Sequence, residues 1–100
     1  MDISELIGRC TGFQWDKGNN AKIWERHLVS SNECEQVFVN EPLYAALNGE
    51  HSTAAEQRYT VFGRTNAGRK LTVVFTIRGE VIRVISARDM NRRERKAYAK

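Results

Sequence analysis

The stretch RKLTVVFTIRGEVIRVISAR, residues 69–88, decides the fold. β-Branched and aromatic residues fill both sides of Gly79-Glu80, and a two-residue Gly-X connection is typical of a type II′ hairpin turn. We therefore expect two antiparallel strands, over 69–78 and 81–88. The turn fixes their register, because residues at equal distances from it pair with each other. The predicted pairs are Arg78 with Val81, Ile77 with Ile82, Thr76 with Arg83, Phe75 with Val84, Val74 with Ile85 and Val73 with Ser86.

This register separates the side chains of the hairpin onto two faces. Arg78 and Arg83 lie one pair apart on a half-polar face, where like charges repel unless an anion lies between them. Either an anion site or two arginines extended into water is expected there. Thr72 and Thr76 share this face with Val74, Val81 and Ile85, whereas the opposite, core face carries Leu71, Val73, Phe75, Ile77, Ile82 and Val84.

Three helices are expected in the N-terminal half of the chain. Residues 2–9 have helical spacing with Asp2 as a cap, and a second helix is expected from about Asn19 to Leu28. Ser30 forms a capping box with residue 33 that starts a third. We interpret Trp15 and Trp24 as core residues rather than platforms for base stacking. The apolar stripe of the second helix is Ile23, Trp24, His27 and Leu28, and the third helix buries Cys34, Val37 and Phe38.

After the third helix the sequence turns to strands. Pro42 stops the helix, residues 43–47 form a short edge strand, and residues 48–56 form a loop. Another strand is expected over 57–64. Asn91 has capping-box spacing to an acid three residues later and starts a short basic helix.

Charge is divided unevenly along the chain. Residues 69–100 contain ten Lys/Arg and three Asp/Glu, a net +7, whereas residues 1–68 carry −3. A basic half interleaved with strand residues indicates a surface that meets phosphate. A solvated basic face, or a binding surface for an acidic protein, would have the same net charge.

Length and composition indicate one globular domain over residues 1–100. No apolar run is long enough for a membrane span, and the first residues lack the basic and apolar regions of a signal peptide. A cytoplasmic protein without membrane contact is expected. The spacing of Cys10, His27, Cys34 and His51 does not match a zinc site, so no metal or cofactor is predicted.

The remaining chemistry suits RNA cleavage without a metal. A base takes the 2′-hydroxyl proton, cations stabilise the phosphorane, and an acid protonates the leaving oxygen. Histidine exchanges protons near neutral pH, which makes His27 and His51 candidates for base or acid. His27 also fits a half-buried histidine bound to a backbone group. Glu56 is a further candidate base, and the guanidinium groups that match phosphate are those of Arg58, Arg78, Arg83 and Arg88.

Three blocks of sequence, taken together, resemble the BrnT family of toxins. They are WDKGNNAKIWERH (15–27), HSTAAEQRY (51–59) and VVFTIRGEVIRVISARDMNRRERKAY (73–98). The resemblance covers residues 13–98 and leaves 1–12 as an N-terminal extension. It implies a small α+β domain similar to RelE: N-terminal helices packed on an antiparallel sheet of three to four strands, and a short basic C-terminal helix.

The resemblance also implies a function. We expect the toxin of a type II toxin–antitoxin module: an mRNA interferase, active without metal or cofactor, that inhibits translation and growth. A BrnA-type antitoxin would neutralise it in a hetero-oligomer that binds operator DNA through the antitoxin. RNA is the expected substrate, and the ribosome a further candidate partner. The family's motif positions correspond here to Trp15, Asp16, Lys22, His27, His51, Glu56, Arg58, Arg78, Arg83, Ser86 and Arg88.

We predict two groups of site residues, most of them at these motif positions. The catalytic group is Glu56, Arg58, Arg78, Arg83, His51 and His27, and the RNA-binding group is Lys22, Arg64, Arg88 and Arg92.

Two residues depart from the family pattern K-N-x-x-K-H-G-V. Ile23 replaces a polar Asn, and Leu28 replaces a Gly suited to a left-handed helix end. A copy altered there could be slow or inactive. A decayed toxin that only binds its antitoxin, and a non-catalytic nucleic-acid-binding module, are therefore the alternative hypotheses.

Overall fold

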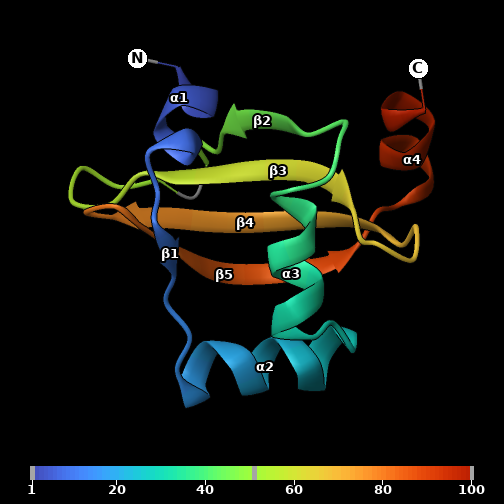
Figure 1. Cartoon of the computed structure of the whole chain (residues 1–100), viewed down its shortest axis with the longest axis horizontal. Coiled ribbons are helices and arrows are strands. Elements are labelled where there is room, and N and C mark those ends of the chain that lie inside the picture. Colours follow the sequence, from blue (N-terminus) through green and yellow to red (C-terminus); the bar gives the residue numbers. More distant parts are fainter. Residues whose placement is uncertain (1, 51, 100) are drawn as a thin grey trace.

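The computed structural model describes residues 2–50 and 52–99, which form helices around one five-stranded sheet (Figure 1). No helix in these residues is long and apolar enough to span a membrane. The elements, in chain order, are α1 (Ile3–Gly8), β1 (Gly12–Phe13), α2 (Lys17–His27), α3 (Ser31–Val37), β2 (Tyr44–Leu47), β3 (Arg58–Arg64), β4 (Lys70–Arg78), β5 (Val81–Asp89) and α4 (Arg92–Tyr98).

The sheet has the strand order β1-β5-β4-β3-β2. Strands β2 to β5 are antiparallel, as predicted, and β2 is the expected edge strand. The predicted α+β class is confirmed, but the sheet has five strands and is mixed. The fifth strand is β1, whose Gly12 and Phe13 pair in parallel with Val81 and Ile82. The alternation of Phe13 and Trp15 in the sequence is typical of a short strand at this place.

The hairpin register is confirmed next to its turn. The pairs from Arg78 with Val81 to Phe75 with Val84 form as predicted. Gly79 has a φ of 64°, the positive value that a type II′ turn requires at its first central residue.

Further from the turn the predicted register is wrong by one residue. Val74 pairs with Ser86 rather than Ile85, because a β-bulge absorbs one extra residue of β5. The bulge keeps Arg83 and Arg88 on the same face, although five positions separate them.

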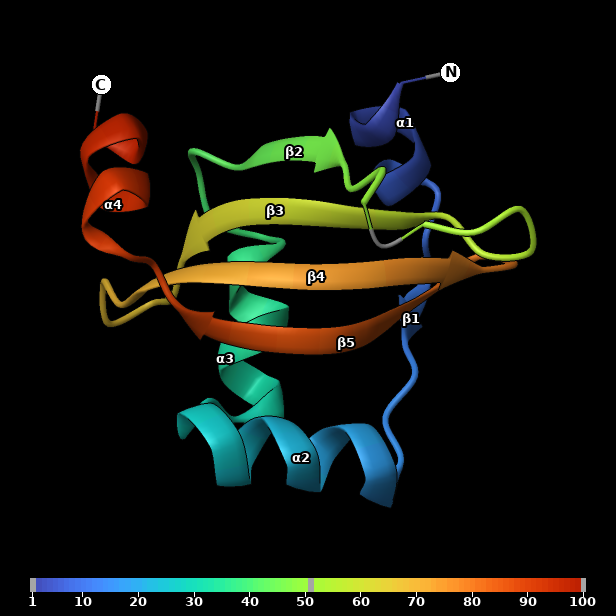
Figure 2. The same ribbon diagram turned by 180° about the vertical axis from the view of Figure 1, so that it is seen from behind.

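One face of the sheet is covered and the other is largely open. Helices α1 and α3 lie over the covered face, and α2 runs beside β5 (Figure 1). From behind, the middle of β3, β4 and β5 has no helix over it, and α4 stands at one end (Figure 2). We call this side the open face. The buried core on the covered side includes Leu71, Val73, Phe75, Ile82 and Val84 from the hairpin, with Cys34 and Val37 from α3, while Ile77 and Phe38 are partly buried.

The helix caps were predicted more accurately than the helix faces. Asp2, Ser30 and Asn91 cap α1, α3 and α4 as expected. α2 begins earlier than predicted because Asp16 caps it in a capping box with Asn19.

The predicted apolar stripe of α2 is largely wrong. Ile23 is buried, whereas Trp24 and Leu28 are 52% and 61% exposed and His27 is exposed rather than half-buried. Trp15, by contrast, packs partly buried against the core. The helix buries only a narrow strip of its surface against β5, so that some of its apolar side chains stay exposed.

Candidate active site

A row of side chains crosses the three central strands on the open face. Arg58 pairs with Thr76, and Thr76 pairs with Arg83. Arg78 lies two residues beyond Thr76 and therefore on the same face. Buried Thr76 donates a hydrogen bond of 2.8 Å to the carbonyl of Gln57, which fixes the start of β3.

These arginines line a hollow of about 350 Å³ between the sheet and α2. Its charged lining is strongly positive, with four cations against one carboxylate, and this suits a phosphate. Five of the predicted site residues meet here: Lys22 from α2, Glu56 from the loop before β3, and three strand arginines. The lining residues are Gly18, Asn19, Lys22, Glu56, Arg58, Arg78, Arg83 and Ile85.

Glu56 bridges two of the arginines. One carboxylate oxygen accepts from Nε of Arg58 at 3.2 Å, and the other from Nη2 of Arg78 at 3.2 Å. These hydrogen bonds, with that of Arg78 the stronger influence, hold the pKa of Glu56 below its ordinary value. Glu56 is therefore an anion at neutral pH, able to accept a proton.

Arg83 is held from the opposite side of the hollow. Its Nη1 donates to Oδ2 of Asp16 at 2.9 Å. The pKa of Asp16 is lowered first by the backbone N–H of Asn19 and then by Arg83. The Asn19 side chain donates to the carbonyl of Val84 at 3.1 Å, which fastens the start of α2 to β5. Arg78 and Arg83 thus have separate carboxylate partners.

His27 lies next to the hollow rather than in it. It lines a smaller space of about 120 Å³ that shares Lys22 and Ile85 with the first. Ile23, the departure from the family's Asn, is buried in the core and contributes to the same small space. The predicted site residue His51 falls outside the described residues.

Three further predicted RNA-binding residues lie away from the hollow. Arg88 is bound to Glu94 through Nη1 at 2.6 Å and Nη2 at 3.0 Å. Arg64 donates from Nε to the carbonyl of Glu41 at 2.8 Å. Arg92 is exposed on the first turn of α4. The structure does not bring these three together with Glu56.

Asp16 was expected only as a family motif position and Asn19 only as the start of a helix, although both help to build the site. A signal was present, because an Asp followed three positions later by Asn is typical of a helix N-terminus. The partnership of Asp16 with Arg83 spans 67 positions and has no local signature.

The cysteines are distant from this chemistry. Cys34 is buried, which raises the pKa of its thiol to about 12, and Cys10 lies partly buried beside α1. Within residues 2–50 and 52–99, no three His, Cys, Asp or Glu residues gather in a way that would hold a metal ion.

Comparison with known proteins gives a match over most of the chain. The sequence model of the family described as "Ribonuclease toxin, BrnT, of type II toxin-antitoxin system" matches residues 15–94. The fold is similar to the crystal structure of the Brucella abortus ribonuclease toxin BrnT, with a TM-score of 0.58 and 19% identity. The match covers 82% of this chain and 99% of that one. A comparison with curated proteins gave no match.

Proposed function

The chain belongs to the BrnT family of ribonuclease toxins of type II toxin–antitoxin systems, and on that premise we propose that the basic hollow is its active site. There it cleaves mRNA without a metal ion, and this cleavage inhibits translation and growth. The observation that carries the proposal is the meeting of Lys22, Glu56, Arg58, Arg78 and Arg83 in one hollow.

The three arginines would bind the scissile phosphate. A guanidinium group presents paired N–H donors that match phosphate oxygens, and each of these arginines makes one ion pair. An RNA phosphate entering the hollow would take the donors that Arg58, Arg78 and Arg83 leave unused. Their charge then stabilises the extra negative charge of the phosphorane.

Glu56 would act as the base. Its ionised carboxylate takes the proton of the 2′-hydroxyl as that oxygen attacks the adjacent phosphorus. The bond from phosphorus to the 5′-oxygen breaks, leaving a 2′,3′-cyclic phosphate and a 5′-hydroxyl. The leaving oxygen takes its proton from His27 or Lys22, which line the adjoining space. His51 remains a further candidate for this step.

The antitoxin of the module would cover the hollow. The antitoxin expected is BrnA-like, with an acidic segment across Arg78 and Arg83, because the positive lining attracts carboxylates as it attracts phosphate. Arg83→Glu should then weaken antitoxin binding and reduce the salt dependence of its association rate. Unchanged affinity would show that the antitoxin binds elsewhere.

Cleavage of free RNA by the purified chain in EDTA tests the proposal. The wild type should cut, whereas Arg78→Glu and Glu56→Gln should each lower the rate by roughly 100-fold or more, since each removes a group that acts in the transition state. Mass spectrometry of the products should show cyclic phosphate ends.

Arg9→Glu is the matched control for Arg78→Glu. It makes the same change of charge at an exposed residue of the N-terminal segment, outside the hollow. Cleavage that stops in EDTA would contradict the metal-independent mechanism. Equal losses of cleavage rate in Arg9→Glu and Arg78→Glu would show that Arg78 acts only through the general attraction of RNA to positive charge. Activity that appears only with added ribosomes would assign the enzyme a ribosome-bound substrate.

A further inference from the structure

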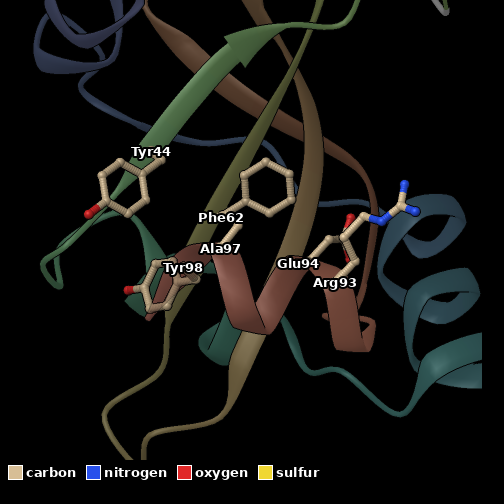
Figure 3. A pocket seen from close by; sticks show the side chains of 6 residues that line it. All are labelled: Tyr44, Phe62, Arg93, Glu94, Ala97 and Tyr98. Carbon is tan, nitrogen blue, oxygen red and sulfur yellow. The ribbon is translucent and has the colours of Figure 1, made fainter. Parts of the chain in front are cut away.

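An apolar pocket of about 550 Å³ lies between α4 and the edge of the sheet, apart from the basic hollow. Figure 3 shows the rings of Tyr44, Phe62 and Tyr98 gathered on one side of it, while the Arg93 guanidinium points away from the rings. The residues that line it are Tyr44, Phe62, Arg93, Glu94, Ala97 and Tyr98.

The aromatic walls of this pocket are fixed by the fold. Tyr44 and Phe62 are direct partners across β2 and β3. The ring of Tyr98 meets that of Tyr44 edge to face, with centroids 5.6 Å apart, and its hydroxyl donates to the carbonyl of Pro42. Tyr98 is buried, whereas Tyr44 remains 48% exposed. A flat ligand would therefore meet a prepared aromatic surface at little cost in side-chain ordering.

Between the aromatic pocket and the basic hollow, the open face carries two further hollows that share lining residues with them. A wider hollow over the middle of the sheet shares Phe62 and Glu94 with the aromatic pocket. It shares Ser86 with the space beside His27, which in turn shares Lys22 with the basic hollow. Along β3, Arg58 of the basic hollow and Phe62 of the aromatic pocket are four residues apart, about 13 Å at the rise of a strand.

Charge at the rim favours a nucleotide over a neutral ligand. Helix α4 carries four basic residues and one acid, Glu94, which is held by Arg88. Arg93 takes part in none of the ion pairs formed among the described residues. Bases have a flat apolar face and phosphates a negative charge, and this pocket offers aromatic rings inside and cations outside.

We infer that the aromatic pocket binds one unpaired base of the single-stranded RNA whose backbone occupies the basic hollow. The inference rests on the proposed function and adds a second subsite to it. The volume falls within the roughly 300–1,000 Å³ usual for small-ligand sites. Base–aromatic stacking is the interaction that sequence-tolerant binders of single strands use.

Two fluorescent oligomers separate the base from the backbone. One is a short 2′-O-methyl RNA, which lacks the attacking hydroxyl and stays intact, and the other is an abasic strand of equal charge. Tyr44→Ala should bind the base-bearing oligomer roughly 5- to 150-fold more weakly and the abasic oligomer unchanged. Tyr44→Phe keeps the ring and should bind both as the wild type does. Ala97→Leu fills the pocket from α4 and should reproduce the loss.

Trp24→Ala is the matched control, because Trp24 is an aromatic residue of similar exposure outside the pocket. A base-dependent loss in Trp24→Ala but not in Tyr44→Ala would overturn the inference, and so would equal losses on both oligomers. Loss of antitoxin binding with RNA binding intact would also overturn it and assign the pocket to a protein side chain. If the protein cleaves RNA but its Tyr44 variants bind both oligomers alike, the base subsite is refuted and the proposed catalysis stands. Base dependence without cleavage supports the subsite while the proposed catalysis fails.

Discussion

Arg69 and Arg78 carry the same group but are held in opposite ways. All three nitrogens of the Arg69 guanidinium donate, to the carboxylates of Glu33 and Asp89 and to the backbone carbonyls of His27 and Leu28. Among the described residues, the Arg78 side chain donates a hydrogen bond to Glu56 alone, and it is 56% exposed. A satisfied arginine fixes structure, whereas one with unused donors can bind a ligand.

The difference shows what a count of charges leaves out. Both residues belong to the basic part of the chain, and the net charge of +7 gives them equal weight. Arg69 ties the end of α2 and the first turn of α3 to the end of β5, which makes it a structural hub. Arg88, bound through two nitrogens to Glu94, resembles Arg69 more than Arg78.

The same substitution should cost much more stability at Arg69 than at Arg78. Arg69→Met should lower the free energy of unfolding by about 2–3 kcal/mol, because it leaves carboxylates and carbonyls without a partner. The melting temperature would fall by roughly 10–20 °C. Arg78→Met should change stability by less than about 0.5 kcal/mol, as exposed ion pairs do. Thermal unfolding of the two variants measures both effects, and similar losses would remove the distinction.

Acid should weaken the Arg88–Glu94 pair. Hydrogen bonding from Arg88 lowers the pKa of Glu94 from 4.5 to about 2. The stabilisation that ionised Glu94 gives to the folded state is complete above the unfolded pKa of about 4.5. It is lost as the pH falls through the folded pKa of about 2. Allowing for solvent screening, about 1–2 kcal/mol should disappear over this window. The stability difference between wild type and Glu94→Gln, followed by urea unfolding, should shrink accordingly. A difference independent of pH would place the contribution of Glu94 in packing instead.

Leu28 tests how Arg69 holds a strained helix end. Leu28 has φ 53° and ψ 41°, the left-handed conformation that disfavours a residue with a Cβ atom, and its carbonyl accepts from Arg69. Leu28→Gly should raise the free energy of unfolding by about 0.5–1 kcal/mol, because relief of strain exceeds the entropy cost of glycine. Leu28→Ala keeps the strain and should change little. A gain of equal size in Leu28→Ala would instead point to the exposed leucine side chain.

Local rules predicted much of this fold, and distant contacts account for the errors. The turn at Gly79 gave the register up to Phe75, and side-chain spacing gave three helix caps. The bulge at Ile85 was missed because the apolar residues around it fit a strand with an extra residue as well as a strand without one. Trp24 was placed in the core because its helical spacing did not reveal how little of α2 the sheet covers.

The grouping in the basic hollow came from the family resemblance together with the chemistry of arginine and glutamate. Sequence could not show that Glu56 joins Arg58 to Arg78, or that Asp16 holds Arg83, since these pairs depend on how the strands and α2 are placed. The aromatic pocket was missed for the same reason. Its rings come from two strands and a helix that no short motif connects.

The link between Asp16 and Arg83 also sets the order of events during synthesis. Helix α2 packs beside β5, which is among the last elements to be made. At about 5–20 residues per second, roughly 3–13 seconds separate the two residues of this pair. Until β5 has emerged from the ribosome, Asp16 lacks its partner Arg83 and α2 lacks the strand that it packs beside. The basic hollow is therefore complete only late in synthesis, once β5 lies beside α2.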